Sequence, residues 1–352
     1  MLPLNGIKVI EFCEVAAGPF CAMLLADQGA DVIKVERAGG DAMRSWPPRT
    51  DGYSENFASV NRNKRSVVFD LKSPDGVAAA KALILSADVV VENFRPGVMN
   101  RLGIGYQTMS AERASLIYCS ISAFGQTGPR STEGGFDLTM QAMAGVMSVT
   151  GEPGGNPVKC GVPLCDFVSG LYGAYGVATA LRQRDATGVG QHIDVSMLGA
   201  TLAVGALQTS EFFGTGSDPA KLGSAHPRNA PYQAFRAADG HFGMAAGNDL
   251  PSASMISFYR LVVDHQDWVS TPTRCSRNFS RRARRSVCRP PTHRWARGPC
   301  HRARARSAAA TYAGPQPRRF FELYVPRAVT LTVTSYLHLR PAEMAPQNVP
   351  LQ

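Results

Sequence analysis

A repeated alternation of short apolar segments with helical segments constrains the fold of this chain more than any other feature. The apolar segments are rich in Val and Ile, and a helix or a glycine-rich turn follows each one; they span residues 7–12, 32–35, 66–71, 89–92, 116–121 and 192–195. Strands that alternate with helices form a parallel sheet with helices on both faces. The sequence therefore predicts an α/β fold built on a parallel sheet.

Helix-end signals support this prediction. Gly29 stands where a helix commonly ends on a glycine, and Ser73 followed by Pro74 is a typical helix start. Two longer helices, rich in small apolar residues, are predicted at residues 167–184 and 197–213.

The second half of the chain contains a hairpin signal. Residues 232–235 and 241–246 are strand-like segments on either side of the Asp239-Gly240 turn. We expect this hairpin to open a second domain. The predicted organisation is a large domain at residues 1–215 and the start of a small domain at residues 216–250.

The basic charge of the chain is concentrated after residue 250. Residues 251–352 contain 17 arginines, no lysine and four acidic residues, a net charge of +13, which leaves −3 for residues 1–250 out of the total of +10. The same segment has 11 prolines and no amphipathic repeat, a composition typical of translation in a wrong reading frame. We therefore expect residues 251–352 to form an aberrant, disordered tail, and the 352-residue product to be poorly soluble and to have little activity.

The cysteine and apolar patterns indicate a cytoplasmic protein without a metal site. The eight cysteines lack the paired spacing of a zinc site and are expected to be free thiols. The apolar runs fall short of the ~18 residues that a membrane-spanning helix needs, and Lys8 and Glu11 interrupt the region where a signal peptide would be apolar.

Asp166 is the most informative carboxylate. It follows the Gly161-Val162-Pro163 turn and immediately precedes the helix predicted at residues 167–184, at the positive end of the helix dipole. Such an aspartate either caps the helix or, if it is open to an acyl carbonyl, serves as a covalent nucleophile. Local pattern alone leaves both interpretations open.

Basic and glycine-rich segments follow several predicted strands, where an open α/β sheet usually binds its ligand. Arg95 and Arg101 follow the strand at 89–92 and could bind phosphates, with Phe94 near a base. The glycines of residues 125–128 and 134–135 could provide backbone N–H groups to an oxyanion, or form ordinary turns.

Six segments in order resemble the family III coenzyme A transferases, the carnitine dehydratase and formyl-CoA transferase group that also includes 2-methylacyl-CoA racemases. They are residues 4–11, 18–19, 26–36, 61–66, 92–97 and 125–129. The resemblance covers about residues 1–250. It implies a Rossmann-like large domain, an incomplete second domain and an interlocked homodimer, although the tail makes a dimer doubtful for this chain.

The resemblance also implies roles for individual residues. Asp166 corresponds to the aspartate that becomes acylated, and the segment Gly223-Ser224-Ala225-His226 resembles a mobile glycine loop that covers the site. Coenzyme A is implied as a substrate, with no metal or redox cofactor. The implied CoA contacts are Val15, Ala17, Arg37, Leu71, Lys72, Asn93, Phe94 and Arg101.

The implied reaction moves CoA from an acyl-CoA to a carboxylic acid, through an aspartyl-acyl anhydride and an aspartyl-CoA thioester. A small dicarboxylate is the expected acid, because relatives with a Gly-aromatic-Asp segment like Gly135-Phe136-Asp137 use such acids. A racemase of the same fold is the first alternative, but it needs a proton-shuttling histidine where this chain has Phe136.

Two alternatives lie outside this family. A nucleic-acid-binding protein would act through the basic tail, with salt-sensitive affinity. A nicotinamide-dependent dehydrogenase is disfavoured because the first loop, at residues 13–17, lacks a glycine fingerprint.

Overall fold

The computed structural model describes residues 1–229, 232–237, 240–245 and 311–312. The chain divides into two compact units. The first unit comprises residues 1–148 and 158–219, and the second comprises residues 149–157 together with the described residues from 220 onward. The sequence placed the end of the large domain at residue 215, close to this division, but did not assign residues 149–157 to the second unit.

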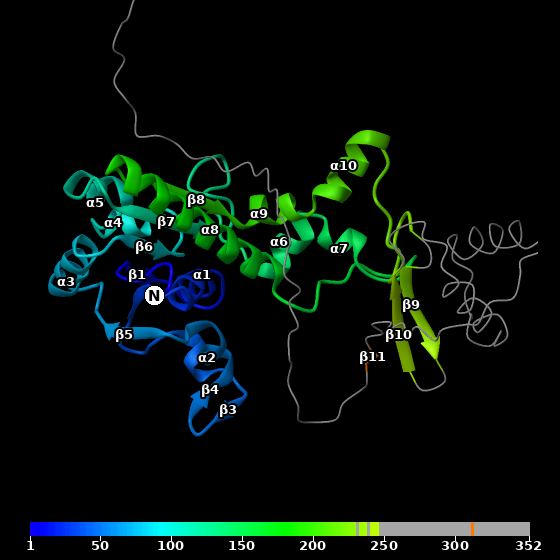
Figure 1. Ribbon diagram of the computed structural model, residues 1–352, viewed down its shortest axis with the longest axis horizontal. Coiled ribbons are helices and arrows are strands. Elements are labelled where there is room, and N and C mark those ends of the chain that lie inside the picture. Colours follow the sequence, from blue (N-terminus) through cyan, green and yellow to red (C-terminus); the bar gives the residue numbers. More distant parts are fainter. Residues whose placement is uncertain (230–231, 238–239, 246–310, 313–352) are drawn as a thin grey trace, which may run out of the picture. The chain divides into compact units, whose positions relative to one another are not determined.

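The first unit is built on a six-stranded parallel sheet, as predicted (Figure 1). Its strands are β1 (Lys8–Phe12), β2 (Asp31–Glu36), β5 (Lys64–Val68), β6 (Val89–Glu92), β7 (Ile117–Ser122) and β8 (His192–Ser196), in the order β5-β2-β1-β6-β7-β8. The strand order reverses between β1 and β6. Open α/β sheets bind ligands at the carboxyl ends of the strands beside such a reversal.

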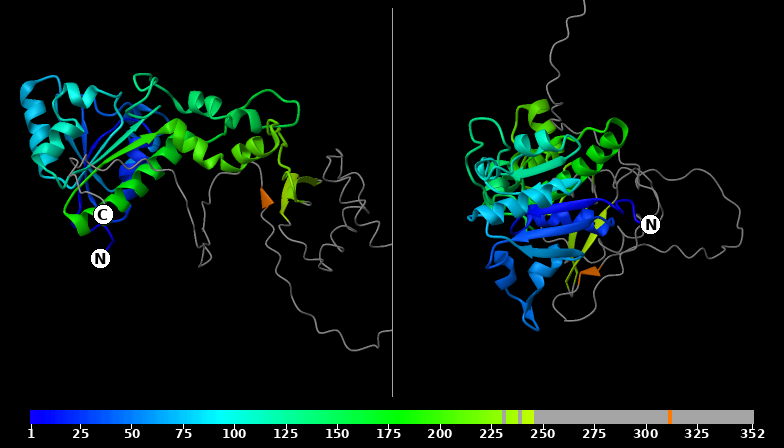
Figure 2. Two further views of the ribbon diagram at one scale, coloured as in Figure 1. Left: turned by 90° about the horizontal axis from the view of Figure 1, so that it is seen from above. Right: turned by 90° about the vertical axis from the view of Figure 1, so that its left-hand side faces the viewer.

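Helices cover both faces of this sheet (Figure 2). Val9, Val89 and Ile117 pack with α1 (Ala17–Asp27) and α8 (Leu164–Thr187) in one core. Their neighbours Ile10 and Val90 pack in the other core, with α3 (Pro74–Leu85), α4 (Val98–Arg101) and α5 (Tyr106–Glu112). Successive side chains of a strand point to opposite faces, so these nearly continuous apolar strands supply both cores.

Helices α1 and α8 approach each other closely at their N-terminal ends. A Cβ placed on Gly170 would lie 2.6 Å from the carbonyl oxygen of Ala17. The rings of Phe20 and Phe167 are 4.8 Å apart between centroids. By length and apolar composition α8 could also cross a membrane, but its buried side packs against α1 and the sheet, as in a core helix.

The structure shifts several predicted boundaries. The strand predicted at residues 66–71 is β5, which begins at Lys64 because its register with β2 pairs Lys64 with Val32. The helix predicted at 197–213 divides at Gly205 into α9 (Met197–Val204) and α10 (Ala206–Thr215). The predicted cap of α3 is confirmed, since the Ser73 hydroxyl accepts a hydrogen bond from Gly76 N–H.

The sequence patterns did not indicate the elements between β2 and β5 or those that follow β7. The former are a 3-10 helix η1 (Ala42–Ser45), the strands β3 (Arg49–Thr50) and β4 (Tyr53–Ser54), and α2 (Glu55–Asn61); the latter are α6 (Asp137–Met143) and α7 (Val146–Val149). These elements are short, and their apolar periodicity is too brief to stand out from loop sequence.

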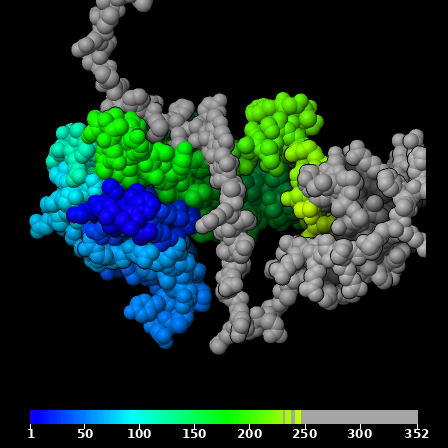
Figure 3. All heavy atoms as spheres, viewed as in Figure 1, coloured from blue at the N-terminus to red at the C-terminus, as the bar shows by residue number. Residues whose placement is uncertain are grey.

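Large apolar side chains are exposed on α9 and α10, and α10 lies at the surface in Figure 3. They are Leu202, Val204, Leu207, Phe212 and Phe213. Phe213 is 79% exposed. Large exposed apolar patches are typical of surfaces that contact another molecule.

The second unit contains the predicted hairpin. Its strands are β9 (Tyr232–Ala237) and β10 (Gly240–Ala245), and β11 (Thr311–Tyr312) pairs antiparallel with β10. Two residues of the segment predicted to be disordered therefore form a strand. Asp239, Ala246 and the rest of the tail prediction lie outside the described residues.

Candidate active site

Asp166 lies inside the first turn of α8, which corrects the sequence interpretation. The helix begins at Leu164 rather than at residue 167, and Pro163 occupies its N-cap position. Asp166 is therefore the third helical residue and not the cap. The helix starts earlier because the N–H of Cys165 finds its acceptor on another element, the carboxylate of Asp137.

The carboxyl group of Asp166 is partly buried. Within the described part of the chain no group donates a hydrogen bond to it. Burial and the nearby carboxylate of Asp137 raise the pKa of Asp166 to about 6. At neutral pH the group is therefore ionised and can act as a nucleophile, although it is a stronger base than an ordinary aspartate.

Asp137 has contacts that the sequence pattern did not indicate. One oxygen of its carboxylate accepts the N–H of Cys165 at 2.8 Å, and the other accepts the side chain of Gln141 at 2.6 Å. Gln141 in turn accepts the N–H of Cys160 at 2.7 Å. These bonds tie the segment before Asp166 to α6. Asp137 is 28 residues away from Cys165 in sequence, so local pattern gave no sign of the contact.

The segment beside Asp137 combines an exposed aromatic ring with glycines. Phe136 is 82% exposed. A Cβ on Gly135 would lie 2.8 Å from the side chain of Ala123, so Gly135 packs against the residue that follows β7. The triplet Gly135-Phe136-Asp137 therefore runs past the carboxyl end of the sheet toward the start of α8.

The predicted oxyanion donors are only partly available. The N–H of Gln126 is bonded to the carboxylate of Asp194, at 2.9 and 3.1 Å from its two oxygens. That donor is therefore occupied. Among the described residues, the side-chain nitrogen of Gln126 and the hydroxyl of Ser122 are buried without a partner in this region. Buried polar atoms of this kind commonly bind a water or a ligand.

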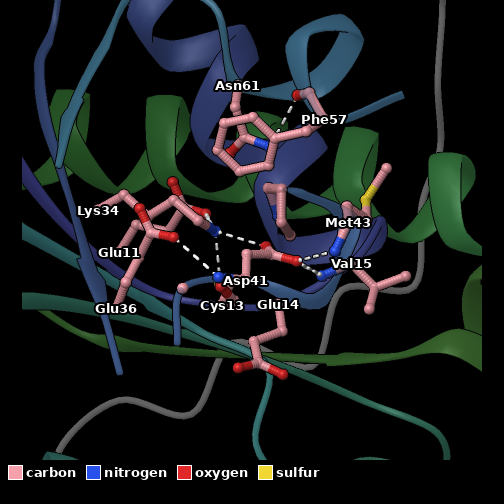
Figure 4. A network of polar contacts seen from close by, with 12 residues as sticks. Glu11, Cys13, Glu14, Val15, Lys34, Glu36, Asp41, Met43, Phe57 and Asn61 are labelled. Carbon is pink, nitrogen blue, oxygen red and sulfur yellow. Dashed lines mark hydrogen bonds and ion pairs between the residues drawn. The ribbon is translucent and has the colours of Figure 1, made fainter. Parts of the chain in front are cut away.

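The predicted CoA contacts of the first loop lie between β1 and α1. Val15 has φ 65°, a left-handed conformation that is unusual for a β-branched residue. Its N–H points to the carboxylate of Asp41, at 3.3 and 3.4 Å from the two oxygens (Figure 4). Ala17 is buried at the start of α1, where its carbonyl oxygen faces Gly170 of α8. This loop therefore adjoins the helix that carries Asp166.

The predicted contacts after β6 face the same loop. Asn93 forms two hydrogen bonds with the backbone of Glu14, accepting its N–H at 3.0 Å and donating to its carbonyl at 2.9 Å. The side chain of Asn93 thus joins the loops on either side of the strand reversal. Phe94 packs against the α3-side core, and its N–H donates to the carboxylate of Glu92 at 2.9 Å.

Glu92 is buried at the end of β6. Burial raises its pKa to about 7, against the opposing effect of hydrogen bonds from Ser120 and from the N–H of Phe94. His192 of β8 bonds to the same Ser120 at 3.0 Å, and burial lowers the pKa of His192 to about 4. This polar chain supports the β6 loop from inside the sheet.

The remaining predicted CoA contacts follow β2, follow β5 or end α4. Arg37 follows β2 and is exposed, with its guanidinium 3.3 Å from the Glu14 carboxylate. Leu71 and Lys72 follow β5, and Lys72 is exposed. Arg101 ends α4 and is exposed. Parallel strands end at one edge, so all eight predicted contacts follow strands at the same edge of the sheet.

The glycine segment at residues 223–226 belongs to the second unit. The N–H of Gly223 bonds to the carbonyl of Gly151 at 2.9 Å, and His226 accepts the N–H groups of Arg228 and Asn229. Its predicted role as a cover for the site stays a prediction.

The structure shows the state of the cysteines and the grouping of metal-ligating side chains among the described residues. The five cysteines there, Cys13, Cys21, Cys119, Cys160 and Cys165, are free thiols. In the same part of the chain, no group of three or more metal-ligating side chains comes together.

Comparison with known proteins identifies relatives over most of this chain. The chain is 44% identical over 255 residues to the succinate–glutarate CoA-transferase of Agrobacterium fabrum, covering 70% of this chain and 64% of the relative. It is 40% identical to the human succinyl-CoA:glutarate CoA-transferase, covering 72% and 58%. The chain thus spans less than two thirds of the length of these relatives.

A solved structure and a family profile agree with these relatives. The crystal structure of a CAIB/BAIF family protein from Brucella suis superposes with a TM-score of 0.71 at 37% identity, covering 81% of this chain and 76% of that one. The sequence profile of CoA-transferase family III matches residues 4–296, which extends past Leu250, where the resemblance in sequence motifs ended. The chain belongs to CoA-transferase family III.

Proposed function

We propose that this protein is an acyl-CoA:carboxylate CoA-transferase that uses Asp166 as its nucleophile. The observation that carries the proposal is the Asp166 carboxylate itself. It lies at the start of α8 without a hydrogen-bond donor among the described residues, has a pKa of about 6, and adjoins the β1–α1 loop. Family membership supports this assignment of the reaction.

The reaction proceeds by four exchanges at carbonyl carbons. The Asp166 carboxylate attacks the donor thioester, giving an aspartyl-acyl anhydride and CoA thiolate. The thiolate attacks the aspartyl carbonyl, forming an aspartyl-CoA thioester and releasing the donor acid. The acceptor carboxylate then attacks the aspartyl thioester, and the released thiolate attacks the acceptor's acyl carbon. Asp166 is regenerated, and no proton is gained or lost overall.

Coenzyme A is assigned to the carboxyl edge of the sheet at the strand reversal. Val15, Ala17, Asn93 and Phe94 flank the reversal between β1 and β6. Arg37, Lys72 and Arg101 lie at the same edge and provide positive charges for the phosphates; Leu71 adds apolar surface beside them. The start of α8 adjoins this edge, so a bound thioester can reach Asp166.

Small dicarboxylic acids are the proposed substrate class. The relatives include enzymes named for succinate, glutarate and, in Acetobacter aceti, oxalate. Arg95 is suited to the second carboxylate: the residue is exposed and its guanidinium lies beside Gly134, where a Cβ added to the glycine would be 3.2 to 3.4 Å from three guanidinium atoms. Within the described ranges no carboxylate pairs with Arg95. Gly134 is only three residues from Asp137.

A homodimer and a cytoplasmic location are part of the proposal. The exposed apolar side chains of α9 and α10 would be covered by a second copy of the chain. This dimer follows from the family resemblance.

The proposal is tested by trapping the intermediate. The 352-residue chain, and a chimera in which the residues after Leu250 are replaced by the C-terminal part of the Agrobacterium fabrum relative, are incubated with succinyl-CoA and hydroxylamine. Mass spectrometry should place a hydroxamate on Asp166, and the chimera should transfer CoA to glutarate. Asp166→Ala should abolish both. Turnover retained in Asp166→Ala would refute the mechanism, and exchange of an α-proton of a 2-methylacyl-CoA in deuterated water would favour the racemase.

A further inference from the structure

Val15 adopts a backbone conformation that its own side chain opposes. A β-branched residue with φ 65° is strained, and such strain persists only where the surrounding structure enforces it. Val15 lies in the β1–α1 loop, to which the proposed function assigns the CoA. The contacts that enforce its conformation are therefore relevant to ligand binding.

Asp41 is the residue that holds the N–H of Val15. Both of its carboxylate oxygens face this N–H, and one of them also accepts the N–H of Met43 at 2.9 Å. The backbone of Asp41 is fixed as well, because its N–H donates to the Glu36 carboxylate at 2.9 Å. Asp41 is only 2% exposed, so its orientation is set by the protein and not by water.

Two buried lysines, Lys34 and Lys64, complete the network; Figure 4 shows Lys34 between Glu11 and Asp41. Lys34 contacts Asp41 at 3.0 Å, Glu11 at 2.9 Å and the carbonyl of Cys13 at 2.7 Å. Lys64 contacts the other oxygen of Glu11 at 2.8 Å and the carbonyl of Pro19 at 2.8 Å. Two lysines thus balance two carboxylates.

The hydrogen bonds of this network reach the backbone around the β1–α1 loop at three places. The network bonds to the backbone before the strained residue, at it, and after it, at Cys13, Val15 and Pro19. Burial lowers the pKa of Lys34, but the carboxylates of Glu11 and Asp41 outweigh it and hold that pKa above its usual range. The cation that orients Asp41 is therefore present throughout the physiological pH range.

We propose that Asp41 is a positioning residue for CoA binding: held by Lys34, it fixes Val15 in its left-handed conformation and so pre-forms the β1–α1 loop for the ligand. The inference rests on the proposed function, because that function assigns CoA to this loop. A pre-formed loop binds more tightly because the cost of ordering it is met during folding.

The test measures CoA affinity and loop dynamics in the full chain. Isothermal titration calorimetry gives the Kd for CoA, and hydrogen exchange reports the amides of residues 13–17. Asp41→Asn is expected to raise the Kd at least tenfold and to speed exchange at Val15. Arg65→Gln is the matched control: it removes a charge from β5, beside Lys64, whose ion-pair partner is the exposed Asp31 and not Asp41 or residues 13–19. It should change the Kd by less than twofold.

A second background shows whether Asp41 acts through Val15. Glycine adopts positive φ without strain, so Val15→Gly removes the need for Asp41 and offsets part of the loss of stability. In that background Asp41→Asn should weaken CoA binding much less than in the native chain. Comparing Val15→Gly with and without Asp41→Asn also tests the role of Asp41 if Asp41→Asn alone does not fold.

The outcomes separate the inference from the proposed function. If the native chain binds CoA and Asp41→Asn binds it equally well, the positioning role is wrong and the proposed function stands. An equal loss of affinity in the native and Val15→Gly backgrounds also refutes it. If neither the native chain nor the chimera binds CoA, the proposed function fails and the inference falls with it.

Discussion

The carboxylate of Asp137 accepts the backbone N–H of Cys165 at 2.8 Å, which brings a second negative charge to the first turn of the helix that carries Asp166. The contact links the loop after β7 to α8. It also explains why Asp166 is not needed as the helix cap and why its carboxylate stays without a donor in the described residues. The negative charge of Asp137 is one cause of the raised pKa of Asp166, and this effect can be measured.

The pH dependence of acylation should report the Asp166 carboxyl group. Its pKa of about 6 lies above the ordinary value of 3.8, so the protonated, unreactive form persists to higher pH. In the chimera, kcat/KM for succinyl-CoA should rise with pH and level above about 6. Asp137→Asn removes the like charge and should move this rise in kcat/KM to lower pH. Burial, the larger cause of the raised pKa of Asp166, remains in this variant. If the rise of kcat/KM with pH were unchanged in Asp137→Asn, the two carboxyl groups would not interact. Glu133→Gln, which breaks an exposed ion pair with Arg130, is the control.

Removal of the charged residues proposed to contact CoA should weaken binding more than turnover. Arg37→Ala and Arg101→Ala each delete a guanidinium at the carboxyl edge of the sheet, and a charge-assisted contact contributes about 1.5 to 3 kcal/mol. The KM for acyl-CoA should therefore rise roughly 10- to 100-fold while kcat changes little. Arg65→Ala, which loses an exposed pair with Asp31 at the start of β2, should leave the KM unaltered. A KM within about twofold of native for both variants would mean that the phosphates lie elsewhere.

Arg95 should determine the preference for dicarboxylic acceptors. Arg95→Ala should lower kcat/KM for glutarate by about 10- to 100-fold, the effect of losing one charge-assisted contact, and should leave a monocarboxylic acceptor such as butyrate nearly unchanged. Steady-state kinetics of the chimera with both acids measure this ratio. Arg62→Ala, whose guanidinium pairs with Asp27, is the control. Equal losses for the two acceptors would assign Arg95 to CoA or to folding instead.

The close approach of α1 and α8 should not tolerate a methyl group. Gly170→Ala places a Cβ 2.6 Å from the Ala17 carbonyl and 3.1 Å from the Cys21 nitrogen, both backbone atoms that cannot move independently. The unfolding free energy should fall by about 1 to 3 kcal/mol, as for overpacking. Gly199→Ala in α9 meets only ordinary contacts at 3.5 and 3.6 Å and should be neutral or stabilising, by up to about 1 kcal/mol. Denaturant titration of both variants checks the contrast, and equal effects would contradict it.

The sequence by itself determined the parallel sheet and predicted Asp166 as the nucleophile. The run Val89–Val91 is apolar on both faces, and the Ser73-Pro74 pair marks a helix start, so short-range preferences already select these elements. Family motifs pointed to Asp166 and to the loops after β1 and β6. The start of α8, by contrast, was misplaced by three residues, because the acceptor that permits it comes from Asp137 in a different element.

Only the tertiary structure decided which charges act together. In the sequence, Lys34 is one charge inside an apolar run, and Asp41 is a polar residue in a loop. In the fold they meet Glu11 and the backbone of Val15, with Lys34 and Asp41 nearly free of solvent. Local sequence preferences act over a few residues, whereas a buried charge is stable only where distant partners neutralise it. The chain specifies those partners through the order of β1, β2 and β5 in the sheet, which periodicity and motif spacing do not reveal.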